Sequence, residues 1–130
     1  MIKKPKGWDH LKRWDSGERQ AVEERIEERI AKGYVINPTK NNIYRALELT
    51  PFEKCTVCIL GQDPYPEPSY ATGVAFSVPA EVKKLPPTLV TILTEYSKDL
   101  GLEFPSSGSL EAWCDQGVLL WNAVPTCEAY

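Results

Sequence analysis

This sequence of 130 residues has little histidine and methionine and no excess of basic over acidic residues. It contains one histidine, His10, and one methionine, and its formal net charge is −3 at pH 7. A negative net charge predicts no general affinity for nucleic acid or for anionic membranes. No run reaches the ~18 apolar residues of a membrane span, and the first residues lack the apolar core of a signal peptide. We therefore expect a cytoplasmic protein that does not enter the membrane.

Four cysteines occur without a secretion signal, which favours free thiols in a reducing compartment. Cys55 and Cys58 form a CxxC spacing that could indicate a metal or cluster site. They fall within a strand pattern, however, where residues three apart point to opposite faces, and no second close pair follows. We expect thiols of the core rather than metal ligands, and neither a metal nor another cofactor.

The content of 42% hydrophobic and 25% charged residues is that of a globular protein, and the pattern along the chain predicts an α/β fold. Residues 1–17 are basic, and we expect a loose lead-in whose tryptophans dock on the core, although a nucleic-acid-binding arm is the alternative. The expected elements then follow as a helix over 18–32, a helix over 40–49, a strand over 55–60, a helix from Thr88 to about residue 100 capped by that threonine, a short helix capped by Ser109, and a strand over 117–121.

Both strands are expected to be buried, because their side chains are apolar and partly β-branched. They predict a three-layer architecture with a central parallel sheet flanked by helices, of which this chain holds only the first two strands. Two strands make a poor parallel sheet, so we expect residues 1–130 to be the amino-terminal portion of a single larger domain.

Polar and aromatic residues gather where the two strands end. Gln62, Asp63 and Tyr65 follow the first strand and Asn122 ends the second, and ligands of open α/β folds bind beyond such strand ends. Asn122 could offer one donor and one acceptor to a flat heterocycle, Phe76 could stack on its ring, and Asp63 could orient water or stabilise positive charge. Taken singly, the same residues also suit a turn, a strand end and the core.

The long proline-rich loop over 61–87 contains the apolar segment 73–78, which argues against disorder. At its end, Pro86, Pro87 and Thr88 provide a rigid turn before a helix. The hydroxyl group and the free backbone N–H groups there suit a phosphate.

These motifs together resemble the uracil-DNA glycosylases of base-excision repair. The resemblance covers about residues 34–127. Its main segments are Gly61-Gln-Asp-Pro-Tyr65, Ala71-Thr-Gly-Val-Ala-Phe-Ser-Val78 and Leu119-Leu-Trp-Asn-Ala-Val124, and the upstream stretches 37–47, 49–52 and 57–60 resemble the family as well. It implies an enzyme that hydrolyses the N-glycosidic bond of uracil flipped out of DNA.

The resemblance also implies a role for each matched residue. Asp63 would orient the water and stabilise the sugar cation. Gln62 would contribute to the uracil pocket through its backbone, Tyr65 would exclude the methyl group of thymine, Phe76 would stack on the base, and Asn122 would read its Watson–Crick edge. Pro86, Pro87 and Thr88 would grip a DNA phosphate. Expected partners are uracil-containing DNA, single- or double-stranded, and a protein inhibitor of the family; we expect a monomer.

The sequence departs from the family pattern at several points. The family usually has histidine after the tyrosine, where this chain has Pro66, and its His-Pro-Ser-Pro segment is absent from these 130 residues. The proline loop has fewer prolines than in the family, and Lys83 and Lys84 before it could supply phosphate contacts instead. We expect little activity from the isolated chain; the alternative function is a non-catalytic remnant that binds uracil, DNA or a protein partner.

Overall fold

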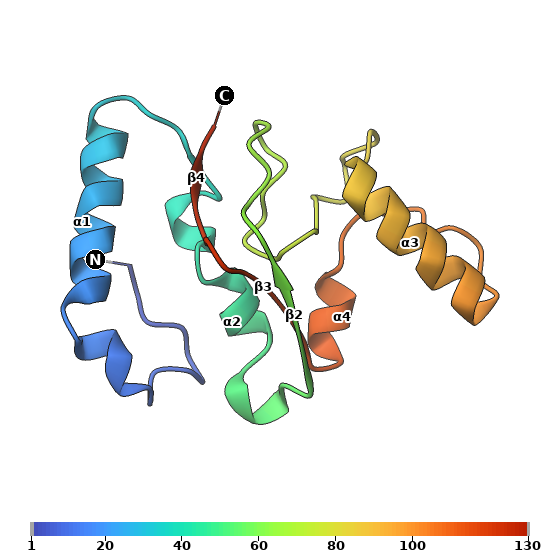
Figure 1. Cartoon of the computed structure of the whole chain (residues 1–130), viewed down its shortest axis with the longest axis horizontal. Coiled ribbons are helices and arrows are strands. Elements are labelled where there is room, and N and C mark those ends of the chain that lie inside the picture. Colours follow the sequence, from blue (N-terminus) through green and yellow to red (C-terminus); the bar gives the residue numbers. More distant parts are fainter. Residues whose placement is uncertain (1, 130) are drawn as a thin grey trace.

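The computed structural model describes residues 2–129 as an elongated arrangement, with α1 at one end, α3 at the other and the strands between them (Figure 1). The helices are α1 (Glu18–Ala31), α2 (Arg45–Leu49), α3 (Pro87–Leu100) and α4 (Glu111–Asp115). The strands are β1 (Ile36–Asn37), β2 (Val57–Gly61), β3 (Val118–Asn122) and β4 (Cys127–Glu128). Single 3-10 turns span Lys12–Asp15, Lys40–Asn42 and Phe52–Lys54.

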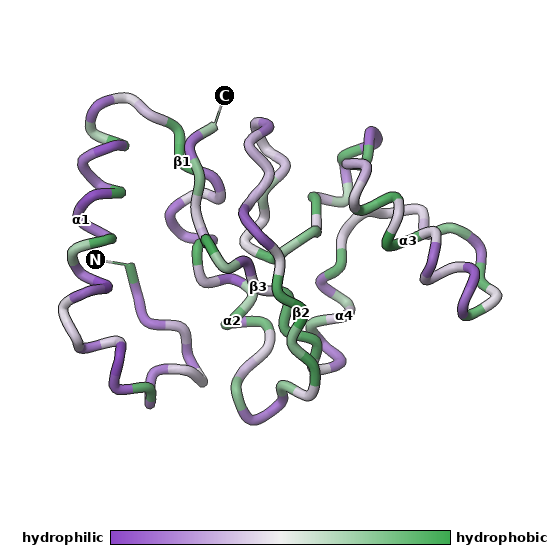
Figure 2. The backbone as a smooth tube through the Cα atoms, in the orientation of Figure 1, coloured by the Kyte–Doolittle hydropathy of each residue, from purple (hydrophilic) through white to green (hydrophobic). Residues whose placement is uncertain are grey.

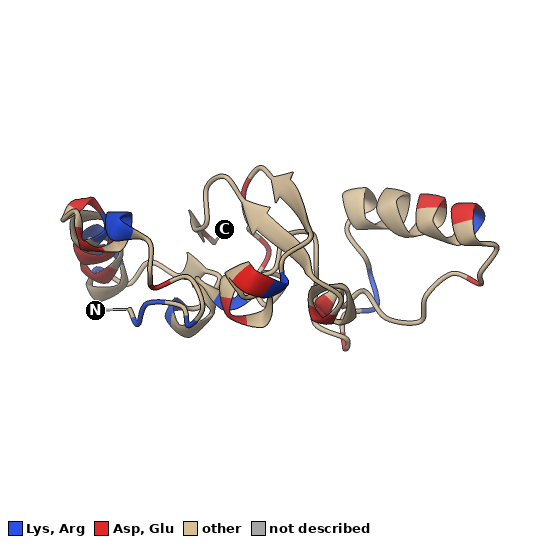
Figure 3. Ribbon diagram, turned by 90° about the horizontal axis from the view of Figure 1, so that it is seen from below, with Lys and Arg blue, Asp and Glu red and all other residues tan. Residues whose placement is uncertain are grey.

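The expected parallel pair of strands is confirmed. β2 and β3 run parallel in a register that pairs Val57 with Val118 and Gly61 with Asn122. Helices α2 and α4 pack against β3 and lie on one side of the strand pair, which is itself free of charged residues (Figure 3). The layers are therefore those of an α/β fold with a short sheet.

A second sheet, of only two residues per strand, was not predicted. β1 and β4 are antiparallel and pair Ile36 with Glu128 and Asn37 with Cys127. Two residues are too few to show the alternation of apolar and polar side chains that identifies a strand in sequence. This pairing joins segments 90 residues apart and lies beside the loop that follows β2.

The core lies between β3, α3, α4 and the loop that precedes α3. Leu89 and Leu93 of α3 and Leu120 of β3 are at most 1% exposed. Val74 and Val78 of the loop are buried with them, and the Ala75 N–H donates to the Leu120 carbonyl oxygen at 3.0 Å. The apolar loop segment is therefore ordered against the core, as its composition predicted.

The prediction of a buried first strand is wrong for this chain. Val57 is 50% exposed and Leu60 63%, although β2 is one of the most apolar stretches of the backbone (Figure 2). Cys58 is exposed as well, so it is no core thiol, whereas Cys114 is buried and Cys55 and Cys127 are partly buried. The reason is that β2 lies at an edge, with β3 as its single partner.

Helix α1 matches the expected range and lies on the outside, but its inner face was not foreseen. Val22 is 57% exposed, whereas Glu23 is only 3% exposed. Glu23 accepts hydrogen bonds from Arg19 Nε at 2.6 Å, from the Ile2 N–H at 3.0 Å and from the Tyr44 hydroxyl at 3.3 Å. A buried ion pair, rather than an apolar stripe, therefore attaches this side of the helix.

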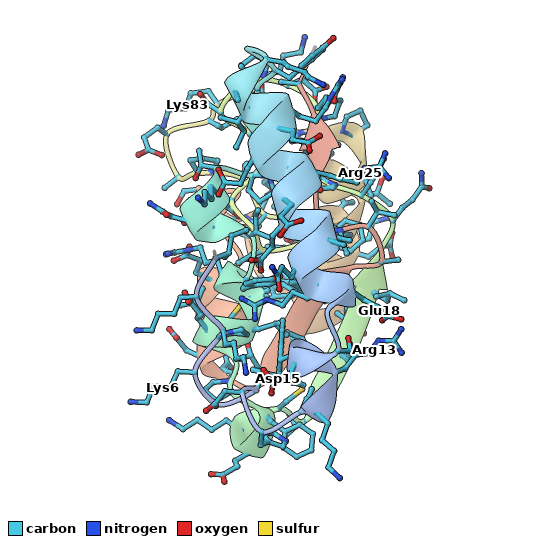
Figure 4. The ribbon with its side chains drawn as sticks, turned by 90° about the vertical axis from the view of Figure 1, so that its left-hand side faces the viewer. Lys6, Arg13, Asp15, Glu18, Arg25 and Lys83 are labelled. Carbon is cyan, nitrogen blue, oxygen red and sulfur yellow. The ribbon has the colours of Figure 1, made fainter. Side chains whose placement is uncertain are left out.

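The tryptophans of the amino-terminal segment lie against the core, as expected. Trp8 Nε1 donates to the Thr50 carbonyl oxygen at 2.9 Å, and Trp14 Nε1 donates to the Trp8 carbonyl oxygen at 2.6 Å. Arg13 bonds to Glu18 at the start of α1, at 2.8 Å, where both side chains face solvent (Figure 4). These bonds connect residues 2–17 to α1 and to the end of α2.

Three expected helix boundaries need correction. The helix over 40–49 is divided into a 3-10 turn and α2. Helix α3 begins at Pro87 with Pro86 as its N-cap residue, so Thr88 lies inside the helix and caps nothing. Helix α4 has Leu110, not Ser109, at its N-cap, and the Leu110 N–H donates to the Ser77 hydroxyl at 2.9 Å. In each case a tertiary contact or a proline decides the boundary, which local side-chain chemistry did not reveal.

Candidate functional site

The two parallel strands end side by side and stay joined beyond their last residues. Gly61 pairs with Asn122. The Ala123 N–H then donates to the Gly61 carbonyl oxygen at 2.9 Å, and the Val124 N–H donates to the Gln62 carbonyl oxygen at 3.0 Å. The two chemically rich segments therefore start from one fixed edge, as expected for the carboxyl ends of parallel strands.

Gly61 allows an unusually close approach of the predicted base-binding groups. A Cβ atom at this position would lie 2.3 Å from Asn122 Oδ1, 3.3 Å from the Phe76 ring and 3.4 Å from Ala75 Cβ. The amide of Asn122 and the ring of Phe76 therefore both lie against the side of Gly61 where another residue would carry its Cβ atom. A glycine is needed here because of this contact and not because of its backbone dihedral angles.

Tyr65 is bonded to the segment that carries Phe76. Its hydroxyl group donates to the Phe76 carbonyl oxygen at 2.8 Å, and Phe76 has a φ of +66°, in the left-handed region. Burial, with a smaller contribution from the Glu67 carboxylate, raises the pKa of Tyr65 to about 12. The phenol is therefore protonated at neutral pH and holds this strained backbone position.

These residues line one cavity of about 450 Å³. Of the predicted site residues, it brings together Gln62, Asp63, Tyr65, Phe76, Thr88 and Asn122. Pro86 and Pro87 are not among its lining residues, although they immediately precede Thr88. Most of the predicted site residues therefore lie around one cavity. Of the predicted phosphate-binding turn, only its last residue, Thr88, lines this cavity.

The sequence reasoning missed part of the cavity wall. Pro38, Ile43 and Trp121 also line it. Trp121 stacks on Tyr44, with ring centroids 6.4 Å apart, and Tyr44 meets Trp14 edge to face at 5.3 Å. The position of Trp121 directly before Asn122 was a signal that could have identified it.

Among the residues that line the cavity, Asp63 carries a charge. Asp63 is exposed, and burial raises the pKa of the neighbouring Cys127 thiol, with further contributions from the Asp63 and Glu67 carboxylates. Lys83 and Lys84, which precede α3, are exposed (Figure 4 labels Lys83). In residues 2–129 no three His, Cys, Asp or Glu side chains gather in metal-binding geometry, and no helix is long and apolar enough to cross a membrane.

Comparison of the sequence with known proteins returns uracil-DNA glycosylases. No family model matches the chain. The uracil-DNA glycosylase of Coxiella burnetii (strain RSA 493 / Nine Mile phase I) is 52% identical over 97 residues, which are 75% of this chain and 42% of the relative. That of Thermobifida fusca (strain YX) is 45% identical over 101 residues, 78% of this chain and 44% of the relative. The chain thus spans less than half the length of the curated relatives it matches.

Solved structures give the same result. The crystal structure of mimivirus uracil-DNA glycosylase superposes with a TM-score of 0.83 at 28% identity, over 95% of this chain and 47% of that chain. A variant of mimivirus UNG in complex with UGI superposes with a TM-score of 0.86 at 29% identity, over 98% of this chain and 49% of that chain.

The fold and the cavity at the strand ends place the chain among the α/β proteins with a DNA-glycosylase architecture. Within this class, the chain is 45–52% identical to curated uracil-DNA glycosylases over the matched residues. The chain belongs to the uracil-DNA glycosylase family.

Proposed function

We propose that this chain supplies the base-recognising half of an enzyme that releases uracil from DNA by hydrolysis of the N-glycosidic bond. The observation that carries the proposal is the convergence of the Asn122 amide and the Phe76 ring over Gly61, within one cavity. An aromatic face and a carboxamide suit uracil, because the amide offers one donor and one acceptor to its edge. Cytosine presents the opposite donor and acceptor pattern.

Asp63 is the proposed catalytic residue. In glycoside hydrolysis a carboxylate beside the scissile bond activates water and stabilises the cation-like sugar of the transition state. Asp63 is exposed on the cavity lining, where water has access to it. Gln62 shares this edge, and its carbonyl oxygen is held by Val124, so its contribution comes through the backbone.

Tyr65 and the start of α3 complete the proposed recognition of substrate. The Tyr65 ring lines the cavity, and its hydroxyl group is bonded to the Phe76 carbonyl oxygen. We propose that this ring excludes the methyl group of thymine. The base reaches the cavity by flipping out of the DNA, since the bond is not accessible inside a duplex. Pro86, Pro87 and Thr88 stand at the N-terminus of α3, and we propose that this turn holds a phosphate of the DNA backbone next to the flipped base.

The test is release of uracil from a uracil-containing single-stranded oligonucleotide by this chain, combined with a second polypeptide that supplies the part of a related enzyme outside the match. We expect Asp63→Asn to lower kcat by ~10²–10⁴-fold, the usual contribution of a positioned acid or base. We expect Asn122→Ala to abolish most of the preference for uracil over cytosine. Asp99→Asn and Asn41→Ala change the same residue types at exposed sites outside the cavity, and they serve as controls. Unchanged rates in both site variants would sink the assignment.

We further propose that residues 1–130 form the amino-terminal portion of one glycosylase domain. The support is the exposure of β2, whose Val57, Ile59 and Leu60 are 50%, 38% and 63% exposed, because strands of parallel sheets are normally covered on both faces. The chain also spans less than half of its relatives. We expect little uracil release from the chain alone. A second polypeptide with the part of the Coxiella burnetii enzyme outside the match should restore it.

Lack of restoration, combined with salt-dependent binding of DNA, would favour the alternative of a non-catalytic remnant. Binding of UGI to the chain is a further partner we propose, since a variant of mimivirus UNG is similar and its structure holds UGI. The place of action we propose is the cytoplasm, where a chain of this kind would meet DNA.

A further inference from the structure

Three consecutive carbonyl groups after β2 are bonded by side chains of the small β1–β4 sheet. Asn37 Nδ2 donates to the carbonyl oxygens of Tyr65 and Pro66, at 3.2 Å each. The Cys127 thiol donates to the carbonyl oxygen of Pro64 at 3.5 Å and to that of Tyr65 at 3.8 Å. Asn37 and Cys127 are paired in the β1–β4 register, so one unit supplies both donors.

The loop has limited means of holding this shape by itself. Pro64 and Pro66 have no N–H group, so neither residue can donate a backbone hydrogen bond. Asn37 is only 6% exposed, so its side-chain amide has little access to water. Its N–H groups therefore need the two loop carbonyl oxygens as hydrogen-bond acceptors. Burial and the nearby carboxylates raise the pKa of Cys127, which keeps the thiol protonated and able to donate.

The same loop carries the residues on which the proposed chemistry depends. Asp63 is exposed, so its carboxylate is directed mainly by the backbone that carries it. Tyr65 extends the connection to Phe76 through its hydroxyl group. A shift of the loop backbone would therefore displace the carboxylate and the ring stack together.

We propose that Asn37, assisted by Cys127, is a positioning residue that orients the Asp63–Tyr65 loop through its carbonyl groups. The role in catalysis rests on the proposed function, whereas the orientation of the loop does not. Asn37 is not among the residues that line the cavity, so in this proposal it acts through the loop.

The experiment uses the 130-residue chain and ¹⁵N relaxation of the Asp63 and Tyr65 amides. Asn37→Leu keeps the size of the side chain and removes its donors, and we expect the order parameters to fall from about 0.85 to below about 0.6. Asn41→Leu makes the same change at an exposed site and should leave them unchanged. Cys127→Ala is the milder second variant, for the case that Asn37→Leu does not fold, and should give a smaller fall. Circular dichroism verifies the fold of each variant.

A kinetic measurement distinguishes a role of Asn37 in positioning the loop from a contribution to the stability of the fold alone. In the preparation that releases uracil, Asn37→Leu should lower kcat by about 100-fold with little change in KM, since a misplacement of about 1 Å costs this much. Unchanged order parameters in folded variants overturn the proposal, as does a lowered order parameter with an unchanged kcat. If the unmodified chain releases no uracil in any preparation, the proposed function fails, and the relaxation data still decide whether Asn37 holds the loop.

Discussion

Gly61→Ala is the substitution for which the structure gives the most definite expectation. The added methyl group would lie 2.3 Å from Asn122 Oδ1, about 1 Å short of ordinary van der Waals contact. On its other side are the Phe76 ring at 3.3 Å and Ala75 Cβ at 3.4 Å, so the methyl group has no free direction. The Asn122 amide must therefore move by about 1 Å, and such a displacement costs about 100-fold in rate.

The cost in stability should be modest by comparison. Overpacking by one methyl group typically costs about 1–3 kcal/mol, and Asn122 can rotate toward the cavity to relieve part of the strain. We therefore expect a folded variant with impaired recognition. Gly101→Ala is the matched control, because its Cβ has open space and its only penalty is the φ of +63° at the end of α3.

The assay is binding of labelled single-stranded oligonucleotides that contain uracil or thymine, followed by anisotropy. Gly61→Ala should weaken binding of the uracil oligonucleotide by at least about tenfold, which is the equivalent of one lost hydrogen bond to a base edge. Binding of the thymine oligonucleotide should hardly change, as should both affinities in Gly101→Ala. Uracil binding by Gly61→Ala at the original affinity would refute the arrangement of Asn122 over Gly61.

Two further predictions concern the bonds that support the site. Tyr65→Phe removes the bond to the Phe76 carbonyl and should cost about 0.5–1.5 kcal/mol at pH 8 in urea unfolding. Folding raises the pKa of Tyr65 from 10.0 to about 12, so the contribution of Tyr65 to the unfolding free energy is complete below pH 10 and is lost as the pH rises through about 12. The difference in unfolding free energy between the unmodified chain and Tyr65→Phe should therefore narrow in that interval. A constant difference would contradict the burial of the Tyr65 phenol. Glu23→Gln leaves the Arg19 charge without its buried partner and should lower the unfolding free energy by about 3–5 kcal/mol, whereas Glu24→Gln, on the exposed side of α1, should change it by less than about 0.5 kcal/mol; equal effects would show that the pair is not buried.

Much of the site was predictable because its signals are local. Apolar, β-branched stretches that stop at a glycine or an asparagine indicate two strands and their ends, and parallel strands bring such ends together. Gln62, Asp63, Tyr65 and Asn122 were named on this basis and Phe76 from the loop between the strands, and all five line one cavity. Their roles in uracil release remain predictions.

The failures lie where distant contacts override a local pattern. Val57 and Leu60 look like buried strand residues, yet they are exposed because exposure depends on what covers a strand and not on its composition. Thr88 resembles a helix cap, but Pro86 and Pro87 start the helix before it. Glu23 looks like a surface residue and is buried by its bonds to Arg19 and Tyr44.

The sequence by itself determined the order of the longer helices and of the two parallel strands, and the polar groups at the strand ends, since each follows from side-chain chemistry within a few residues. Only the tertiary structure decided how closely Asn122 and Phe76 approach Gly61, and that Asn37 and Cys127 bond to the loop carbonyls. The hydrogen bonds to the loop carbonyls join residues 28 to 63 positions apart. No periodicity or turn signal encodes them, because they exist only once the chain has folded.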